Sequence, residues 1–441
     1  MPLSARVAPL PPAAGAVVRL DPFGEALRAQ LAGADPALEA FYRARDYRPI
    51  WIQGWGVKRG AQTVVQAVAD ARADDLDPES YDASGLPEVL ARAASGRSAD
   101  LAAAEIALSA AASGYLSDLH APKPGAQMIY VDPSVAPPRL DRISVLRILG
   151  ASRSPSAAVA DLERMNPYYQ QLRASLAALR ANGGDPATAR LLKVNLERAR
   201  ALPADFGPRY ILVDATAQRL WLYQDGQPVD SMRVVVGKPS EPTPAMAGLV
   251  RYAVIRPYWN IPPDLVQNSV APKVLRYGPG WLASQHMQAL SGWTPDARVL
   301  SPQEVDWAAV AAGRVTLRMR QLPGPDNMMG KVKFVFPNSL GIYLHDSPLR
   351  QFFADQQRTD SAGCVRLSAA PRLAKWLLAA DADQLGQPGP PETRIDLSQP
   401  IPVYIVYFTA IPQGRKLSIR PDIYHRDSTL EAELDRPANR A

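Results

Sequence analysis

Cys364 is the only cysteine of this 441-residue chain, and its setting points to nucleophilic chemistry. A free thiol has a pKa of about 8.5, so only a few per cent is thiolate at pH 7. His345 precedes it by 364 − 345 = 19 positions. A histidine within hydrogen-bond reach can accept the thiol proton and later return it to a leaving amine. Gly363 lets the backbone turn tightly, and the N–H groups of Gly363 and Cys364 could form an oxyanion hole worth about 3 kcal/mol per donor.

A lone cysteine is more often a small buried hydrophobic residue than a nucleophile. The run Ser361-Ala362-Gly363-Cys364-Val365-Arg366, with His345 and Asp346 upstream, favours a nucleophile instead. A core thiol does not need a glycine before it. The sequence therefore predicts Cys364 as nucleophile and His345 as base, placed on different elements.

Four neighbours are candidate oxyanion or substrate-binding residues, each with a structural alternative. Tyr343 alternates with His345 and should share its face, where it either packs or lies near the oxyanion. Arg366 lies two positions after Cys364, so its side chain should point to the same side of an extended chain. There it either makes a structural salt bridge or holds loop carbonyls or a substrate carboxylate. Ser361 is more simply the cap of a turn, and Trp259 more simply a core residue.

Composition limits the classes of protein that fit. The net charge of +6 is spread along the chain without a run of like charges, which argues against a nucleic-acid partner and fits mild attraction to an acidic one. A single cysteine excludes disulfides, and four scattered histidines build no zinc cluster. No stretch of 18 apolar residues occurs, and the first 18 residues make a poor signal peptide, so we expect that an export signal is missing.

The first half of the chain is predicted to be mainly helical. Residues 1–35 read as a flexible lead-in, and helical periodicity then recurs over residues 36–205. An Ala-rich run from Ser98 to Leu119 and a helix face that ends at Asn182 are the clearest parts.

The second half is predicted to be β-rich over residues 206–412, followed by a C-terminal tail over residues 413–441. Asp225-Gly226 marks a hairpin, and Lys331 to Phe336 alternates strictly. Ser368 is the expected cap of a helix through Ala380. Residues 262–325 interrupt the strands with a capping box at Ser301 and Pro/Gly-rich flanks, which predicts an inserted helical flap. The expected fold class is α+β: a helical scaffold domain, a β-rich catalytic domain and an inserted capping flap over Cys364.

Several segments together resemble the L,D-transpeptidase catalytic (YkuD) domain, in its large YcbB-like branch. The likeness covers most of residues 36–425 and rests on the joint match of these segments: Phe41-Tyr42 to Trp51, Asp75 to Pro78, Met232 to Pro244, Pro257 to Pro263, Arg320 to Pro325, Gly330 to Phe334, Phe336 to Ser339, Ile342 to Pro348 and Ser361 to Arg366.

The resemblance implies a mechanism and partners. Cys364 would attack the carbonyl of meso-diaminopimelate, the third residue of a peptidoglycan stem tetrapeptide, expel D-Ala and form a thioester that a second stem's amine resolves. The product is a cross-link between two diaminopimelates. The resemblance implies that no metal or cofactor is needed and that carbapenems inhibit the enzyme. It also implies that a backbone carbonyl orients His345 and that the protein works in the periplasm of a Gram-negative bacterium. A missing N-terminal signal could hold the protein near the membrane, so membrane proximity is an expectation as well.

Two departures from the family pattern stand out. The position directly before Gly363, often a second histidine, is Ala362. Only about 25 residues, Asn182 to Phe206, separate the last helix from the first strand. The peptidoglycan-binding module usual in this branch is therefore expected to be missing.

Two other functions remain open. Water as acceptor would make the chain an L,D-carboxypeptidase or an L,D-endopeptidase, and an inert thiol would make it a non-catalytic cell-wall scaffold. The acceptor is chosen by pocket shape, which sequence does not give. The pair of His345 and Cys364 argues against the scaffold.

Overall fold

A computed structural model describes residues 20–33, 35–414 and 416–435. The chain divides into two compact units. The first comprises the described residues up to 122 together with residues 138–165, and the second comprises residues 123–137 and those from 166 onward. Among the described residues, no helix has the length and apolar character needed to span a bilayer.

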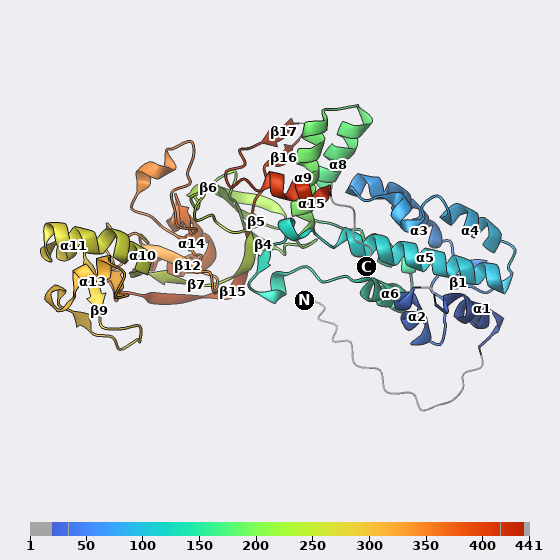
Figure 1. Ribbon diagram of the computed structural model, residues 1–441, viewed down its shortest axis with the longest axis horizontal. Helices are drawn as coiled ribbons and strands as arrows, with labels where there is room; N and C mark the ends of the chain where they lie inside the picture. The colour runs from blue at the N-terminus through green and yellow to red at the C-terminus, as the bar shows by residue number, and fades with distance from the viewer. Residues whose placement is uncertain (1–19, 34, 415, 436–441) are drawn as a thin grey trace. The chain divides into compact units, whose positions relative to one another are not determined.

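The first unit is a helical bundle. Its helices are α1 (Pro22–Leu31), α2 (Pro36–Arg43), α3 (Ala61–Ala69), α4 (Leu86–Ala93), α5 (Ser98–Leu119), α6 (Arg142–Ala151) and α7 (Pro155–Leu162), with a small hairpin of β1 (Ile52–Gln53) and β2 (Gly56–Val57). The predicted helix over 98–119 is confirmed as α5, which runs through the unit with α3 and α4 on one side and α1, α2 and α6 on the other (Figure 1).

The flexible lead-in is wrong for residues 22–31. Asp21 caps α1 by accepting a hydrogen bond from the Gly24 N–H at 2.7 Å, and proline occupies the first helical position. Leu27 and Leu31 are fully buried, because α1 packs on α5. Residues 1–19 of the lead-in lie outside the described residues.

The second unit holds the β-rich part of the chain and two helices that precede it. Its elements outside the insertion are β3 (Ile129–Tyr130), α8 (Pro167–Ala181), α9 (Pro186–Arg200), β4 (Arg209–Asp214), β5 (Arg219–Gln224), β6 (Gln227–Val235), β7 (Met246–Ile255), β12 (Val332–Val335), β13 (Leu344–His345), β14 (Val365–Leu367), α14 (Ala370–Leu378), β15 (Thr393–Val406), β16 (Ala410–Gln413), β17 (Lys416–Ile419) and α15 (Asp427–Leu434). The two compact units therefore divide before α8, and the predicted domain boundary at residue 205 stays a prediction.

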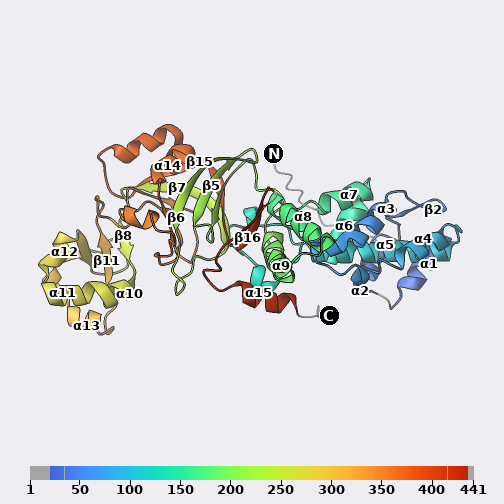
Figure 2. The ribbon, with the colours of Figure 1, turned by 90° about the horizontal axis from the view of Figure 1, so that it is seen from above.

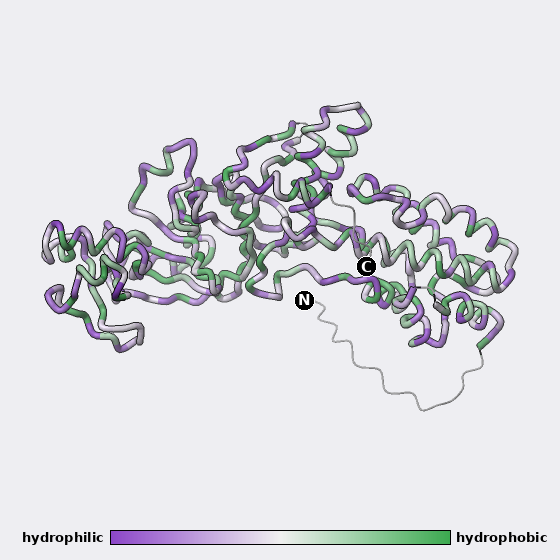
Figure 3. The backbone as a smooth tube through the Cα atoms, viewed as in Figure 1, coloured by the Kyte–Doolittle hydropathy of each residue, from purple (hydrophilic) through white to green (hydrophobic). Residues whose placement is uncertain are grey.

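One nine-stranded sheet organises this unit. Its order is β12-β13-β14-β6-β5-β4-β15-β7-β3, and β12 also pairs with β7, so the sheet closes on itself and leaves few free edges. The β5–β6 turn at Asp225 and Gly226 has positive φ angles of 49° and 75°, which confirms the predicted hairpin. Apolar side chains of these strands form the core of the unit, and Figure 3 shows hydrophobic and hydrophilic residues mixed along this part of the chain.

The insertion was predicted to be helical, and it is mixed. The strand β8 (Trp259–Ile261) precedes it, and the insertion itself contains α10 (Pro263–Leu265), a π-helical turn (Val266–Val270), α11 (Ala271–Tyr277), α12 (Gly280–Ser284), β9 (Met287–Leu290), β10 (Val299–Leu300), α13 (Trp307–Ala311) and β11 (Arg318–Gln321). A four-stranded sheet, β10-β9-β11-β8, packs with these helices around a separate core, and Figure 2 shows the group. Its place over Cys364 stays a prediction.

Two predicted caps have different outcomes. The capping box at Ser301 is present, but its first turn is a 3-10 helix over Pro302–Glu304 and the α-helix begins only at Trp307. Ser368 is not the cap of α14, because Ala369 holds that position without a side-chain hydrogen bond.

Candidate functional site

Cys364 lies in a turn that leads directly into β14. Gly363 before it has φ +96°, in the region that side chains disfavour, and a Cβ there would approach Ile342 Cδ1 to 3.1 Å. The turn is also fixed by Ser361, whose hydroxyl donates to the Cys364 carbonyl at 2.5 Å. Ser361 is 3% exposed, and its hydroxyl is used in the hydrogen bond that holds this turn. The structural alternative given for Ser361, the cap of a turn, therefore describes its position.

The strand register brings the predicted pair together. β13 and β14 are parallel neighbours in which His345 is opposite Arg366. Leu344 and Val365, the alternate residues, are fully buried in the core. Since side chains alternate between faces, His345, Arg366, Cys364 and Tyr343 share the other face. Because His345 is level with Arg366, Cys364 lies diagonally opposite His345, directly before the neighbouring strand and on the same face.

The thiol of Cys364 is half-buried and rests in the neutral form. Its Sγ donates to the Gly341 carbonyl at 3.4 Å. Burial raises the pKa of the Cys364 thiol, and the Tyr343 backbone N–H and the positive charge of Arg366 offset part of that rise. The thiol is therefore protonated at pH 7 and needs a base when it attacks.

His345 is oriented as a base by its own backbone. Its Nδ1 lies 2.6 Å from the Asp346 carbonyl oxygen. A carbonyl can only accept, so Nδ1 carries the proton and Nε2 keeps a free lone pair. Burial, then the positive charges of Arg366 and Lys333, lower the pKa of His345 to about 4. The ring is 4% exposed and neutral at pH 7.

The carboxylate of Asp346 is used elsewhere. Its Oδ2 accepts the Lys331 N–H at 3.0 Å, and its Oδ1 lies 3.6 Å from Arg350. The imidazole is therefore held by a backbone carbonyl and not by a carboxylate, as the resemblance implies. The arrangement can perform proton transfer from a thiol to a neutral imidazole, followed by attack on a carbonyl carbon.

Trp259 lies on a different element from Cys364 and His345. It lies in β8, packs against the core of the insertion and lines a cleft of about 460 Å³ there. The lining of that cleft includes none of Cys364, His345 and Tyr343. The structural alternative given for Trp259, a core residue, describes its position better than a substrate platform.

Comparison with known proteins identifies the domain. Residues 208–405 match the YkuD family of L,D-transpeptidase catalytic domains, and residues 36–176 match a family described as scaffold domain. This chain carries an L,D-transpeptidase catalytic domain. The fold class predicted from sequence, a helical scaffold followed by a β-rich catalytic domain, is confirmed.

A curated relative supports this assignment. The "Putative L,D-transpeptidase" of Haemophilus influenzae is 30% identical over 290 residues, which cover 63% of this chain and 56% of the relative. The chain thus matches little more than half of that protein's length.

Solved structures of the same family are only distantly similar. An L,D-transpeptidase from Mycobacterium smegmatis is 15% identical with a TM-score of 0.22, over 45% of this chain and 58% of that one. The catalytic domain of the Enterococcus faecium enzyme is 18% identical with a TM-score of 0.19, over 45% and 95%. Scores this low carry no argument about this chain.

Two side chains of the catalytic domain were not singled out from sequence. Lys333 is opposite His345 in the β12–β13 register, and its Nζ is 3.4 Å from the Glu392 carboxylate. The Lys333 side chain is only 14% exposed. The second is Thr243, whose hydroxyl donates to the Gly363 carbonyl at 2.8 Å.

The buried His345 predicts acid sensitivity of the catalytic domain. Its folded pKa of about 4 lies below the unfolded value of about 6.5, so the unfolded chain binds more protons between these pH values. Stability therefore rises with pH through this window. His345 should contribute a loss of about 3 kcal/mol when the pH falls from 7 to below 4. Denaturant unfolding of wild type and His345→Ala at several pH values measures it; equal pH dependence of the two proteins would contradict the assignment.

Proposed function

We propose that this chain is an L,D-transpeptidase that joins peptidoglycan stem peptides through a thioester on Cys364. One observation carries the proposal. His345 in β13 and Cys364, directly before the parallel strand β14, lie on one face by strand alternation, and the imidazole Nδ1 bonds the Asp346 carbonyl so that Nε2 is free to accept a proton. The L,D-transpeptidase catalytic domain supplies the reaction class.

The proposed reaction begins on a stem tetrapeptide as donor. The Sγ of Cys364 attacks the carbonyl of the third residue, meso-diaminopimelate, while its proton passes to Nε2 of His345. The tetrahedral intermediate collapses, the C–N bond to the terminal D-Ala breaks, and His345 returns the proton to the leaving amine. A thioester remains. The side-chain amine of a second stem attacks it, the amide of the cross-link forms, and the thiol is regenerated.

Neighbouring groups would stabilise the charges that develop. Within the described residues the backbone N–H groups of Gly363 and Cys364 have no hydrogen-bond acceptor, so they are available to an oxyanion. Arg366 places a positive charge beside both reacting groups, which favours the thiolate and disfavours a protonated imidazole. Tyr343 lines the same face, and its pKa is raised by burial and by the nearby thiol.

The wider setting is part of this proposal. Carbapenems present a strained amide carbonyl and should acylate Cys364 once. A cross-linking enzyme of this type acts in the periplasm of a Gram-negative bacterium, brought there by an N-terminal signal that also sets its distance from the membrane.

Reaction with a defined donor separates the proposed functions. We expect incubation with a disaccharide tetrapeptide to add the donor mass, less D-Ala, to the protein, and then to yield cross-linked dimers. Tripeptide as the dominant product would favour the carboxypeptidase, and cleavage of preformed dimers would favour the endopeptidase. No adduct and no product, from folded protein, would contradict every thioester function and favour a scaffold.

A further inference from the structure

The carbonyl of Gly363 is held from outside the turn by a buried threonine. Thr243 lies between β6 and β7 and is 1% exposed. Its Oγ1 accepts the Gly237 N–H at 2.8 Å and donates to the Gly363 carbonyl at 2.8 Å. A single hydroxyl therefore joins the β6–β7 loop to the peptide bond before Cys364.

A tyrosine from the C-terminal segment closes this arrangement. The Tyr424 hydroxyl donates to the Gly237 carbonyl at 2.8 Å and accepts the Thr243 N–H at 3.3 Å. Arg426 adds a bond from Nη2 to the Thr243 carbonyl at 3.3 Å. Gly237 has no room for a side chain, because a Cβ there would lie 2.2 Å from the Glu241 carbonyl oxygen. The loop is thus closed by hydrogen bonds and by packing.

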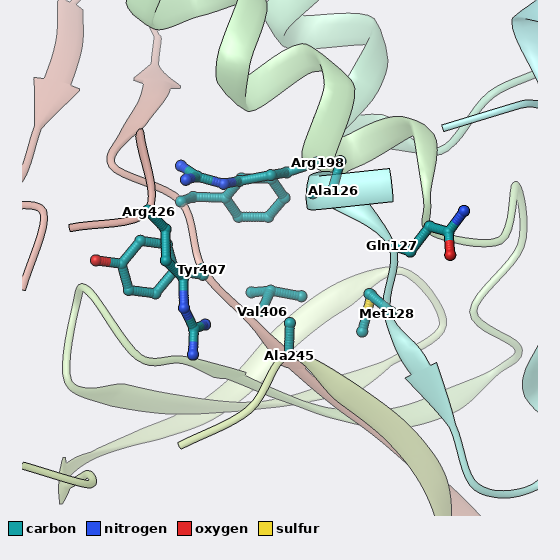
Figure 4. A pocket seen from close by; sticks show the side chains of 10 residues that line it. Ala126, Gln127, Met128, Arg198, Ala245, Val406, Tyr407 and Arg426 are labelled. Atoms are coloured by element: carbon teal, nitrogen blue, oxygen red, sulfur yellow. The ribbon is translucent and has the colours of Figure 1, made fainter. Parts of the chain in front are cut away.

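The segment that supplies Tyr424 is itself well fixed. The Tyr424 N–H donates to the Tyr407 hydroxyl at 2.9 Å, and the two rings stack with centroids 5.4 Å apart. The Tyr407 hydroxyl donates in turn to Asp422. Arg426 lies against the ring of Tyr407, as Figure 4 shows at the edge of a small cavity, with its guanidinium 5.0 Å from that ring. These residues lie near or beyond residue 405, where the match to the catalytic family ends.

The bond to Gly363 has a consequence for the next N–H. A trans peptide is planar, so its C=O and N–H point in opposite directions, and no cis peptide bond occurs among the described residues. Holding the Gly363 oxygen toward Thr243 therefore turns the Cys364 N–H to the opposite side. That N–H has no acceptor within the described residues, which is what an oxyanion donor requires before substrate binds.

We infer that Thr243 and Tyr424 are positioning residues that aim the Cys364 N–H at the oxyanion of the acyl-transfer reaction. The inference rests on the proposed function, and it assigns a role in catalysis to the segment that follows the catalytic domain. Neither residue touches the reacting atoms. Their effect passes through the Gly363–Cys364 peptide plane.

Comparison of two reactions of the same thiol tests the inference. Iodoacetamide alkylation needs a thiolate but forms no oxyanion, whereas acylation by the tetrapeptide donor or by p-nitrophenyl acetate adds to a carbonyl. Thr243→Val keeps the shape of the side chain and removes the hydroxyl. We expect acylation to fall roughly 10- to 100-fold, part of the effect of losing one oxyanion donor. Alkylation at the same pH should stay within about 2-fold of wild type.

Three further variants complete the design. Thr243→Ser restores the hydroxyl and should recover most of the acylation rate. Tyr424→Phe should reduce acylation in the same direction by a smaller factor. Tyr130→Phe is the matched control, because the hydroxyl of Tyr130 donates to the Ala201 carbonyl at 2.6 Å and has no bond to the Cys364 turn. It should leave both reactions unchanged.

The possible results separate this inference from the proposed function. Equal loss of acylation and alkylation in Thr243→Val, no loss of either, or no recovery in Thr243→Ser would each overturn the positioning role. Wild-type protein that reacts with p-nitrophenyl acetate but not with the tetrapeptide would contradict the proposed substrate. The aryl ester would then still measure the ratio of acylation to alkylation on which the inference depends.

Discussion

Replacement of Cys364 by alanine is expected to abolish both the acyl-enzyme and the cross-linked product. A methyl group cannot form a thioester, and Cys364 is the only thiol of the chain, so no other residue of this type can take its place. The core contacts should survive, because Cys364 does not belong to the buried cluster around β13 and β14. Intact mass after incubation with donor, product analysis and the melting temperature measure the three parts of this prediction.

A serine variant is the matched control for shape. Cys364→Ser preserves size and a hydrogen-bond donor toward the Gly341 carbonyl, but a hydroxyl is a far weaker nucleophile beside a neutral imidazole. Turnover should be at or near the level of the alanine variant. Cross-linking by Cys364→Ala at more than about 1% of the wild-type rate would show that the nucleophile is another residue.

The sequence predicted those helices, strands and turns whose stability depends on residues close together in the chain. The hairpin at Asp225 and Gly226 follows from a turn that needs two positive φ angles, and Ser98 to Leu119 follows from an uninterrupted run of helix formers. The strand expected over Lys331 to Phe336 is confirmed as β12, because its alternation reflects one face in the core.

Elements held by distant partners were missed or misplaced. Strand β15 gains its hydrogen bonds from β7, more than a hundred positions earlier, so no local pattern predicts that it begins at Thr393. Helix α1 looked like part of a flexible lead-in, and packing against α5 stabilises it. In the insertion, β9 and β11 pair across almost 30 positions that include α13, and no local pattern shows such a pairing.

The residues of the candidate site also fall into those that the sequence could indicate and those that only the fold brings together. Cys364, Gly363 and His345 were singled out because their types and spacing have chemical meaning, and the register places Cys364 and His345 on one face. Thr243 and Tyr424 carry no such signal. A threonine 364 − 243 = 121 positions before the cysteine becomes relevant only when the fold brings its hydroxyl to the Gly363 carbonyl.

Replacement of His345 has the second largest expected effect and tests the protonation states of the site. A general base accounts for about 100-fold or more in rate, so His345→Ala should reduce acylation of Cys364 at pH 7 by at least that factor. Acylation by a tetrapeptide donor, followed by intact mass, measures it. His120→Ala is the matched control, because the His120 ring also lies against a backbone carbonyl, that of Leu162 at 2.7 Å, but belongs to the helical unit.

The pH profile shows whether His345 acts as a base or only supports the structure. A neutral imidazole is required for proton transfer, and burial with nearby Arg366 and Lys333 lowers the pKa of His345 to about 4. The wild-type acylation rate should therefore rise with pH through about 4 and be level between 6 and 7, where an unperturbed histidine would titrate. In His345→Ala the acid limb should disappear, and the rate should instead follow the thiolate of Cys364, increasing about tenfold per pH unit below its raised pKa. An acid limb near pH 6.5 in wild type would mean that the pKa of His345 is not lowered, and an unchanged limb in the variant would assign it to another group.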